Sequence, residues 1–238
     1  LDNDCDNQTD EDFKTDGKYA TTTACGNCFT NCTAIFAGRA HAYGVCDSAP
    51  ATPVCTMACN AGYYDLNNVP GDGCELALDA TAIYVGTDSP GAIDDATCGL
   101  GPAGTTAGYH PCKTIAYGRT RATATSRTKV LVADGQYNEQ VTVSSGQSLY
   151  GGYRADTWER HVASTGTIIR GPDGSGDRKA VVITDISSTT RLDGFVIYAA
   201  NAISTGANSY GIYVRNATNA LTITNNLALW PNPVADEL

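Results

Sequence analysis

The sequence predicts an all-β fold in two parts, a small disulfide-rich, loop-rich module followed by a larger domain of short stacked strands. Eight of the ten cysteines fall in the first 74 residues, Cys98 and Cys112 follow, and the last 126 residues contain none. From residue 79 onward, short apolar segments alternate with turns every eight to fifteen residues. We therefore expect disulfides to hold the first part and apolar burial to hold the second.

The first predicted element is an acidic loop over residues 1–16. Carboxylates at alternate positions converge on a hard cation when a loop wraps around it, as in an EF-hand. The expected ion is Ca²⁺, and the predicted ligands are Asp2, Asp4, Asp6, Gln8, Asp10 and Asp12. Glu11 or Asp12 must close the shell, because Phe13 stands where an EF-hand has its bidentate Glu. A solvated acidic terminus without an ion is the alternative.

This acidic segment resembles the short aspartate-rich metal-binding motif of the MopE type and the calcium loops of thrombospondin type-3 repeats. The resemblance covers about a dozen residues, and residue 1 falls inside the motif. It implies a calcium-stiffened loop at the start of an extracellular module.

Residues 17–78 form the predicted disulfide-rich module, which we expect to consist of loops. Gly, Asn, Thr and Pro recur every few residues, and no helical or strand period persists. Each bridge would contribute roughly 2–4 kcal/mol, while the connectivity stays open. Zinc at the Cys25–Cys28 pair is the alternative, disfavoured by irregular spacing and only three histidines.

The end of this module, Cys59-Asn-Ala-Gly-Tyr-Tyr-Asp to Gly73-Cys74-Glu75, resembles stalk segments of surface proteins from predatory and soil bacteria. Asp65, Asn67 and Asp72 within it would suit a second weak ion site. A turn-rich loop is the simpler interpretation of the same residues.

The predicted second domain spans residues 79–238 and opens with a cap. Residues 83–85 predict a strand, a Gly- and Pro-rich loop follows with an expected Cys98–Cys112 bridge, and residues 113–122 predict a short helix. Further strand signals lie at residues 130–132, 141–143, 148–150, 167–169, 181–183, 195–197, 212–214 and 221–223.

The turns favour a parallel solenoid over a sandwich or barrel. Hairpin turns such as Asn-Gly are scarce, whereas asparagines follow strands at Asn216 and at Asn225 and Asn226, which fits asparagine stacking at solenoid corners. One central column of aliphatic side chains is expected, formed by Val143, Ile169, Ile183, Ile197 and Ile223. The helix would cap the open N-terminal edge of this stack.

Several segments carry a family resemblance. Ser148-Leu-Tyr-Gly-Gly-Tyr153, Leu192-Asp-Gly-Phe-Val-Ile197 and Leu221-Thr-Ile-Thr-Asn-Asn226 resemble secreted right-handed parallel β-helix proteins of the pectin-lyase-like type. The resemblance spans about residues 82–226 and implies a cap over about 82–125 and coils over about 128–226. That family is defined by its fold, so the resemblance implies little about activity.

Composition narrows the function classes. The net charge is −10, of which residues 1–16 carry −6, so the basic footprint of a nucleic-acid-binding protein is missing. No apolar run approaches the roughly 18 residues of a membrane span. The absence of an initiator Met and of a signal peptide suggests a trimmed, exported chain, and the cysteines favour an extracellular or cell-surface location.

Catalytic residues are not apparent in the sequence. A polysaccharide lyase would need acids and a basic side chain aligned on adjacent coils, which are expected every 20–26 residues. Arg170, Arg191 and Arg215 are 21 and 24 positions apart, but they hold different places relative to their strands, so no ladder is expected.

We therefore expect an exported, non-enzymatic structural or adhesive protein. Its expected partners are a cell-surface polysaccharide or further copies of itself, assembled laterally or end to end as a fibre, because the predicted stack stops near Trp230 without an obvious cap. A carbohydrate-active enzyme and a secreted metal-binding protein are the alternatives.

Overall fold

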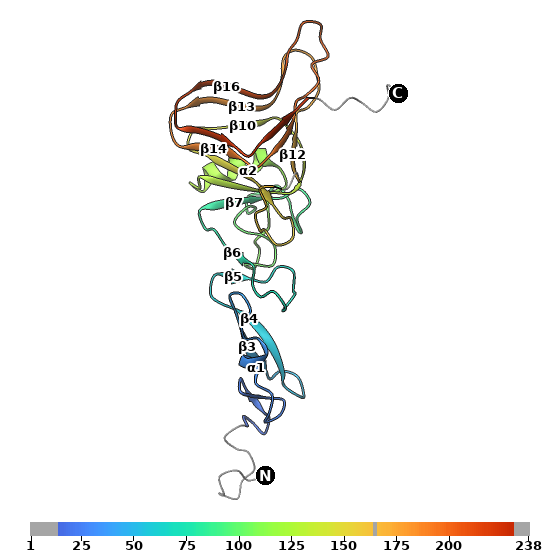
Figure 1. Cartoon of the computed structure of the whole chain (residues 1–238), viewed down its shortest axis with the longest axis vertical. Helices are drawn as coiled ribbons and strands as arrows, with labels where there is room; N and C mark the ends of the chain where they lie inside the picture. The colour runs from blue at the N-terminus through green and yellow to red at the C-terminus, as the bar shows by residue number, and fades with distance from the viewer. Residues whose placement is uncertain (1–13, 164–165, 231–238) are drawn as a thin grey trace, which may run out of the picture. The chain divides into compact units, whose positions relative to one another are not determined.

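The computed structural model describes residues 14–163 and 166–230. The chain divides into two compact units at Leu78 and Asp79 (Figure 1). The fold is strand-rich, with parallel sheets and four disulfides, but two helices also lie among the described residues. The expectation of an all-β chain therefore holds only as a statement that strands dominate.

The first unit contains short antiparallel pairs, which the loop prediction for residues 17–78 missed. Its elements are β1 (Ala20–Thr21), β2 (Ala24–Cys25), α1 (Cys32–Ile35), β3 (Ala42–Asp47), β4 (Val54–Cys59), β5 (Tyr63–Tyr64) and β6 (Leu76–Ala77). β1 pairs with β2, β3 with β4, and β5 with β6. The strands are short and rich in Ala and Cys, so the alternation that identifies an amphipathic strand is weak in them.

Disulfides hold this unit around the β3–β4 hairpin. Cys46 and Cys55 lie opposite each other in the hairpin, and each bonds outward, Cys46 to Cys25 of β2 and Cys55 to Cys32 of α1. The third bridge joins Cys59 to Cys74. The three bridges fix the packing of elements that are too short to bury an apolar core.

Three parallel sheets form the second unit. The five-stranded sheet contains β7 (Ala82–Val85), β8 (Lys129–Ala133), β11 (Ser148–Tyr153), β14 (Thr190–Asp193) and β17 (Leu221–Thr224). The four-stranded sheet contains β9 (Gly135–Asn138), β12 (Thr167–Arg170), β15 (Val196–Tyr198) and β18 (Leu227–Leu229). The three-stranded sheet contains β10 (Val141–Val143), β13 (Arg178–Ile186) and β16 (Ser209–Ala217).

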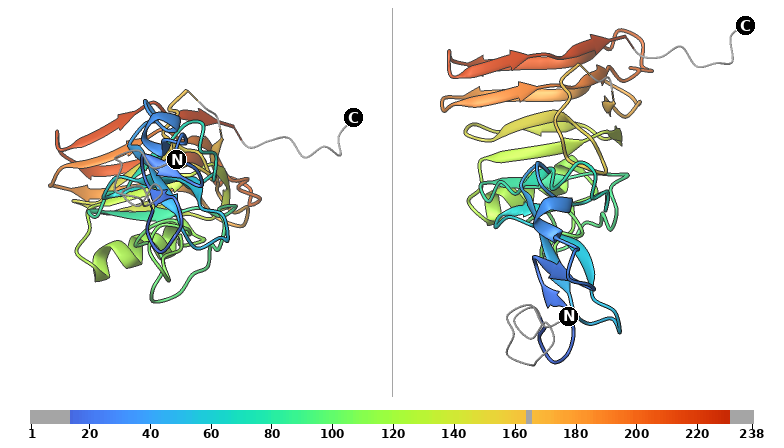
Figure 2. Two further views of the ribbon diagram at one scale, coloured as in Figure 1. Left: turned by 90° about the horizontal axis from the view of Figure 1, so that it is seen from below. Right: turned by 60° about the horizontal axis from the view of Figure 1, so that its bottom comes forward.

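From β8 onward the chain enters the five-, four- and three-stranded sheets in that order, and then starts again. We call one passage through the three sheets a circuit. Every strand pairs in parallel with the strand one circuit away, and the right view of Figure 2 shows these strands stacked from green to red. Parallel pairing throughout rules out the antiparallel sandwich for these sheets.

All nine sequence-predicted strands of this unit overlap observed strands, and β9, β14 and β18 were missed. The expected spacing of 20–26 residues per coil is wrong. Leu149 lies opposite Val130, 19 positions earlier, and opposite Leu192, 43 positions later. Long connections after Tyr153 and Arg170 lengthen that circuit, and such loops leave the strand pattern unchanged.

A single apolar core lies between the three sheets. Val143, Ile169, Ile183 and Ile197 are buried in it as predicted, whereas Ile223 is 39% exposed. The prediction of one central column is wrong, because Val143 lies beside Ile183 in one sheet and Ile169 lies beside Ile197 in another. Each buried aliphatic side chain contributes about 1.5–3 kcal/mol to folding.

The helix α2 (Ile115–Ala124) confirms the predicted helix and covers the first strands. It packs against β7, β8 and β10, and buries Ile115, Gly118 and Ala122. The Glu139 carboxylate beside β10 accepts the backbone N–H groups of Ile115 and Ala116, each at 2.8 Å. These bonds satisfy helix N–H groups that have no partner within the helix.

The predicted Cys98–Cys112 disulfide is also confirmed. The loop segments that this disulfide joins lie along the outer edge of β7. There the Tyr84 N–H donates to the Gly99 carbonyl and the Cys112 N–H donates to the Tyr84 carbonyl, both at 2.9 Å. The first edge of the five-stranded sheet is therefore hydrogen-bonded.

Candidate functional site

The predicted calcium ligands, Asp2, Asp4, Asp6, Gln8, Asp10 and Asp12, lie outside the described residues. Calcium binding by this segment stays a prediction. The second candidate ion site is described, and its polar groups hold a turn. Asp65 accepts the Asn68 N–H at 2.6 Å, and the Asn67 side-chain amide donates to Asp72 at 3.0 Å. These bonds favour the turn interpretation of Asp65, Asn67 and Asp72.

Two groups of potential metal ligands contain sulfur: Cys25, Cys32 and Cys55, and Asp94, Cys98 and Cys112. Every one of these sulfurs belongs to a disulfide, whereas the thiolate is the form that binds metal. Zinc binding by Cys25 and Cys28 is disfavoured, because Cys25 forms a disulfide with Cys46. Cys28 is exposed and is the one cysteine of the described residues without a disulfide.

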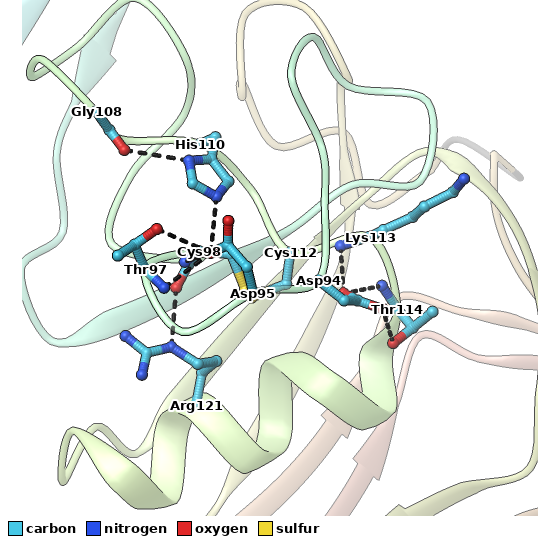
Figure 3. Close-up of polar contacts among 10 residues, drawn as sticks. All are labelled: Asp94, Asp95, Thr97, Cys98, Gly108, His110, Cys112, Lys113, Thr114 and Arg121. Atoms are coloured by element: carbon cyan, nitrogen blue, oxygen red, sulfur yellow. Dashed lines mark hydrogen bonds and ion pairs between the residues drawn. A yellow bond between two sulfur atoms is a disulfide. The ribbon is translucent and has the colours of Figure 1, made fainter.

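Figure 3 shows the polar cluster around the Cys98–Cys112 loop, which sequence reasoning did not single out. His110 contacts the Asp95 carboxylate through Nε2 and the Gly108 carbonyl through Nδ1, both at 3.1 Å. Thr97 donates its N–H and its hydroxyl to the same Asp95 oxygen, each at 2.8 Å. Both histidine nitrogens are engaged within the loop, so neither is available to activate a nucleophile.

These donors also determine the protonation state of Asp95. The N–H and hydroxyl of Thr97, with a contribution from His110, lower the pKa of Asp95 to about 2. A carboxylate that is ionised at neutral pH and accepts from its own loop suits a structural role better than that of a general acid.

Asp94 has the same structural use one residue away. Its carboxylate accepts from the Lys113 N–H at 2.7 Å, the Thr114 N–H at 3.0 Å and the Thr114 hydroxyl at 2.8 Å. Thr114 is in turn the N-cap of α2. The loop therefore fastens the start of the helix (Figure 3), as a negative group at a helix N-terminus should.

An open cavity of about 410 Å³ is lined by acids, an arginine and a histidine. Its lining includes Asp134, Arg154, Asp156 and His161. Arg154 and Asp156 form an ion pair at 3.2 Å, and Asp134 accepts the Thr167 hydroxyl at 3.0 Å. This group would suit the enzymatic alternative.

The three arginines considered for a lyase lie on three different sheets, Arg170 on β12, Arg191 on β14 and Arg215 on β16. They form no ladder, as the strand positions predicted. Arg170 lies over the Tyr198 ring at 4.1 Å, and so joins one circuit to the next.

Asparagines do lie at the strand ends, but the predicted asparagine-on-asparagine stacking is wrong. Four asparagines donate to an aspartate of the preceding circuit, in the pairs Asp173–Asn201, Asp177–Asn208, Asp185–Asn216 and Asp193–Asn225. Asn226, also predicted to stack, instead donates to the Leu192 and Thr224 carbonyls, each at 2.8 Å. Asn216 and Asn225 have φ of 51° and 54°, a conformation that asparagine tolerates well. An amide above a carboxylate supplies a donor to an acceptor, whereas a second carboxylate would repel.

The last circuit presents an apolar surface. We define the open edge as β16, β17 and β18, the final strand of each sheet, which pair on one side only. Val214, Ile223 and Leu227 are 44%, 39% and 48% exposed, one on each sheet. Their partners one circuit earlier, Ile183, Leu192 and Val196, are all buried.

A cavity of about 430 Å³ opens at this edge. Tyr210, Ile212, Leu229 and Trp230 line it, and Trp230 is 85% exposed. The open edge therefore gathers exposed apolar side chains from all three sheets, and the sequence signal for it was the uncapped end near Trp230.

No family model, curated protein or solved structure matches the chain. Neither helix among the described residues has the length and apolar character that crossing a bilayer requires.

Proposed function

We propose that this chain is an exported, non-enzymatic structural or adhesive protein of the cell surface or extracellular space, and that its second unit is a right-handed parallel β-helix. Three parallel sheets that the chain enters in fixed rotation around one core support the fold. Four disulfides are compatible with an oxidising, extracellular location.

One observation carries the proposal: the polar groups of the Cys98–Cys112 loop are taken up by structural bonds, while apolar side chains are exposed on the open edge. Asp94, Asp95 and His110 fasten the Cys98–Cys112 loop. The exposed aliphatic residues lie on the open edge. A protein of this kind acts through contact surfaces, with a polysaccharide or another protein as its partner.

The cavity at Asp134 and His161 favours the second candidate, a carbohydrate-active enzyme. Incubation with pectin, alginate and other polyuronates tests the two against each other, with absorbance of unsaturated product as the readout. We expect no turnover. Turnover that disappears in Asp134→Asn and His161→Ala would instead establish the enzyme.

Calcium binding by residues 2–12 is a separate part of the proposal. Titration of chelator-treated protein with Ca²⁺ should release or absorb heat and raise the melting temperature. The variant Asp4→Asn with Asp6→Asn should abolish both effects, whereas Asp65→Asn should leave them unchanged. No heat from the wild-type protein would refute the calcium site and leave the scaffold role standing.

A further inference from the structure

We infer that the open edge binds the open edge of a second copy of this chain, so that the protein forms a closed dimer and not a fibre. The inference rests on the proposed function, in which strand edges make the functional contacts. It names the partner of that surface, and it narrows the expected assembly from a filament to a pair.

The open edge lacks the features that keep sheet edges apart in monomeric proteins. Natural edges are protected by charged side chains, proline, bulges or a covering helix. Residues 200–230, which contain β16, β17 and β18, carry one charged side chain, Arg215, although 17% of the whole chain is charged. β16 alone exposes a nine-residue edge, Ser209–Ala217.

The polar groups at this edge also suit a second copy. In the four side-chain pairs between circuits, the aspartate belongs to the inner circuit and the asparagine to the later one. In these pairs the outer side chain is therefore an amide, which can both donate and accept hydrogen bonds. Amides facing their own copies can pair, whereas aspartates in the same positions would repel.

Within residues 14–163 and 166–230, the opposite end of the stack is largely covered. Loop backbone occupies the outer edge of β7, and α2 packs against β7, β8 and β10. The loop after β7 also lies close to β9, since a Cβ atom added to Gly135 would lie 2.6 Å from the methyl carbon of Thr87. Among the described strands of the second unit, the edge that best matches an open edge is therefore the open edge of another copy.

Contact between two identical surfaces is isologous and closes after two copies, because a two-fold axis relates them. A fibre would need one end to bind the other end, and the covered end prevents this.

Light scattering coupled to size exclusion, over a concentration series of the full chain, tests the inference. We expect a mass of twice the 24.8 kDa chain. Leu227→Lys and Ile223→Lys should each weaken the dimer at least about tenfold, because they bury an unpaired charge at the contact. The control is Ile93→Lys, since Ile93 is 53% exposed in the loop that precedes Cys98 and should leave the mass unchanged.

Hydrogen exchange supplies a second readout that does not depend on variants. The amides of β16, β17 and β18 should gain protection as the concentration rises, and those of β13 should not. A monomer at every concentration, a ladder of larger assemblies, or a folded Leu227→Lys dimer as tight as wild type would each overturn the inference. A monomer without polyuronate turnover would refute the dimer and leave the proposed structural role standing. A dimer with polyuronate turnover would refute the non-enzymatic role and leave the dimer standing.

Discussion

At the scale of single residues, Asp193 shows how the stack tolerates a buried charge. Its carboxylate contacts the Asn225 amide at 2.9 Å, Arg191 at 3.0 Å and Arg160 at 3.1 Å. Burial raises the pKa of Asp193, but the donors from Asn225, Arg160 and Arg191 outweigh it and hold the pKa below the ordinary 3.8. A buried carboxylate is stable when its oxygens are satisfied in this way.

Asp193→Asn should therefore destabilise the fold by about 2 kcal/mol at neutral pH, because one oxygen is replaced by an amide group that faces guanidinium donors. The lowered pKa means that the stabilisation is complete above pH 3.8 and is lost as pH falls below it. Urea unfolding at several pH values should show the difference between wild type and variant shrinking below that pH.

The matched control is Asp185→Asn. Asp185 also accepts from an asparagine of the next circuit, Asn216, but it is exposed. It should change the unfolding free energy by less than about 0.5 kcal/mol. Equal losses in the two variants would show that burial and the arginine contacts do not decide the effect.

Cys28 leads to a second residue-level prediction. Of the ten cysteines, eight are joined in pairs, Cys28 is exposed, and Cys5 lies outside the described residues. In an oxidising compartment we expect these last two to be joined as well. Peptide mapping under non-reducing conditions should recover a Cys5–Cys28 cross-link, and alkylation of the unreduced protein should label no thiol. A labelled Cys28 would contradict this.

At the scale of elements, β10 tests the core between the sheets. Val143 is buried against Ile183, whereas Thr142 is exposed beside it on the same strand. Val143→Asp should cost more than about 4 kcal/mol, since it leaves an unpaired charge in the core, and cooperative melting should be lost. Thr142→Asp should melt within a few degrees of wild type. Similar melting of the two variants would show the assigned faces to be wrong.

In the helix α2, packing at Gly118 should outweigh the higher helix propensity of alanine. Alanine favours a helix over glycine by about 1 kcal/mol, but a Cβ on Gly118 would lie 2.2 Å from a methyl of Val85. Gly118→Ala should therefore destabilise by about 1–3 kcal/mol, because β7 and α2 must separate. Thr120→Ala, on the exposed side of the same helix, should be neutral or slightly stabilising. Chemical denaturation of both variants measures the contrast.

The elements differ in how far sequence could predict them. β8, β10 and β13 are rich in β-branched residues, so their sequence pattern was sufficient to predict them as strands. β9 was missed because Tyr137 is its one buried side chain in a polar Gly-Gln-Tyr-Asn segment. The polar loop of Asp95 and His110 was missed too, since its contacts cross 15 positions and depend on a fold that no local pattern encodes.

At the scale of the whole molecule, the two units are stabilised by different means. The described residues of the first unit bury few apolar side chains: Ala24, Cys25, Cys32, Cys74 and Leu76. Three disulfides there close loops of 21, 23 and 15 residues, each contributing about 3 kcal/mol by restricting the unfolded chain. The second unit has one disulfide and a core drawn from three sheets.

Reduction should consequently unfold the first unit and leave the second folded. In hydrogen exchange under a strong thiol reductant, the amides of β3 and β4 should lose protection, while those of β13 and β14 should keep it. Loss of the Cys98–Cys112 bridge would weaken the second unit by about 3 kcal/mol, which the core should withstand. The double variant Cys98→Ala with Cys112→Ala isolates that contribution without reductant. Simultaneous loss of protection in both units would show that they fold as one cooperative body and that the disulfides support both.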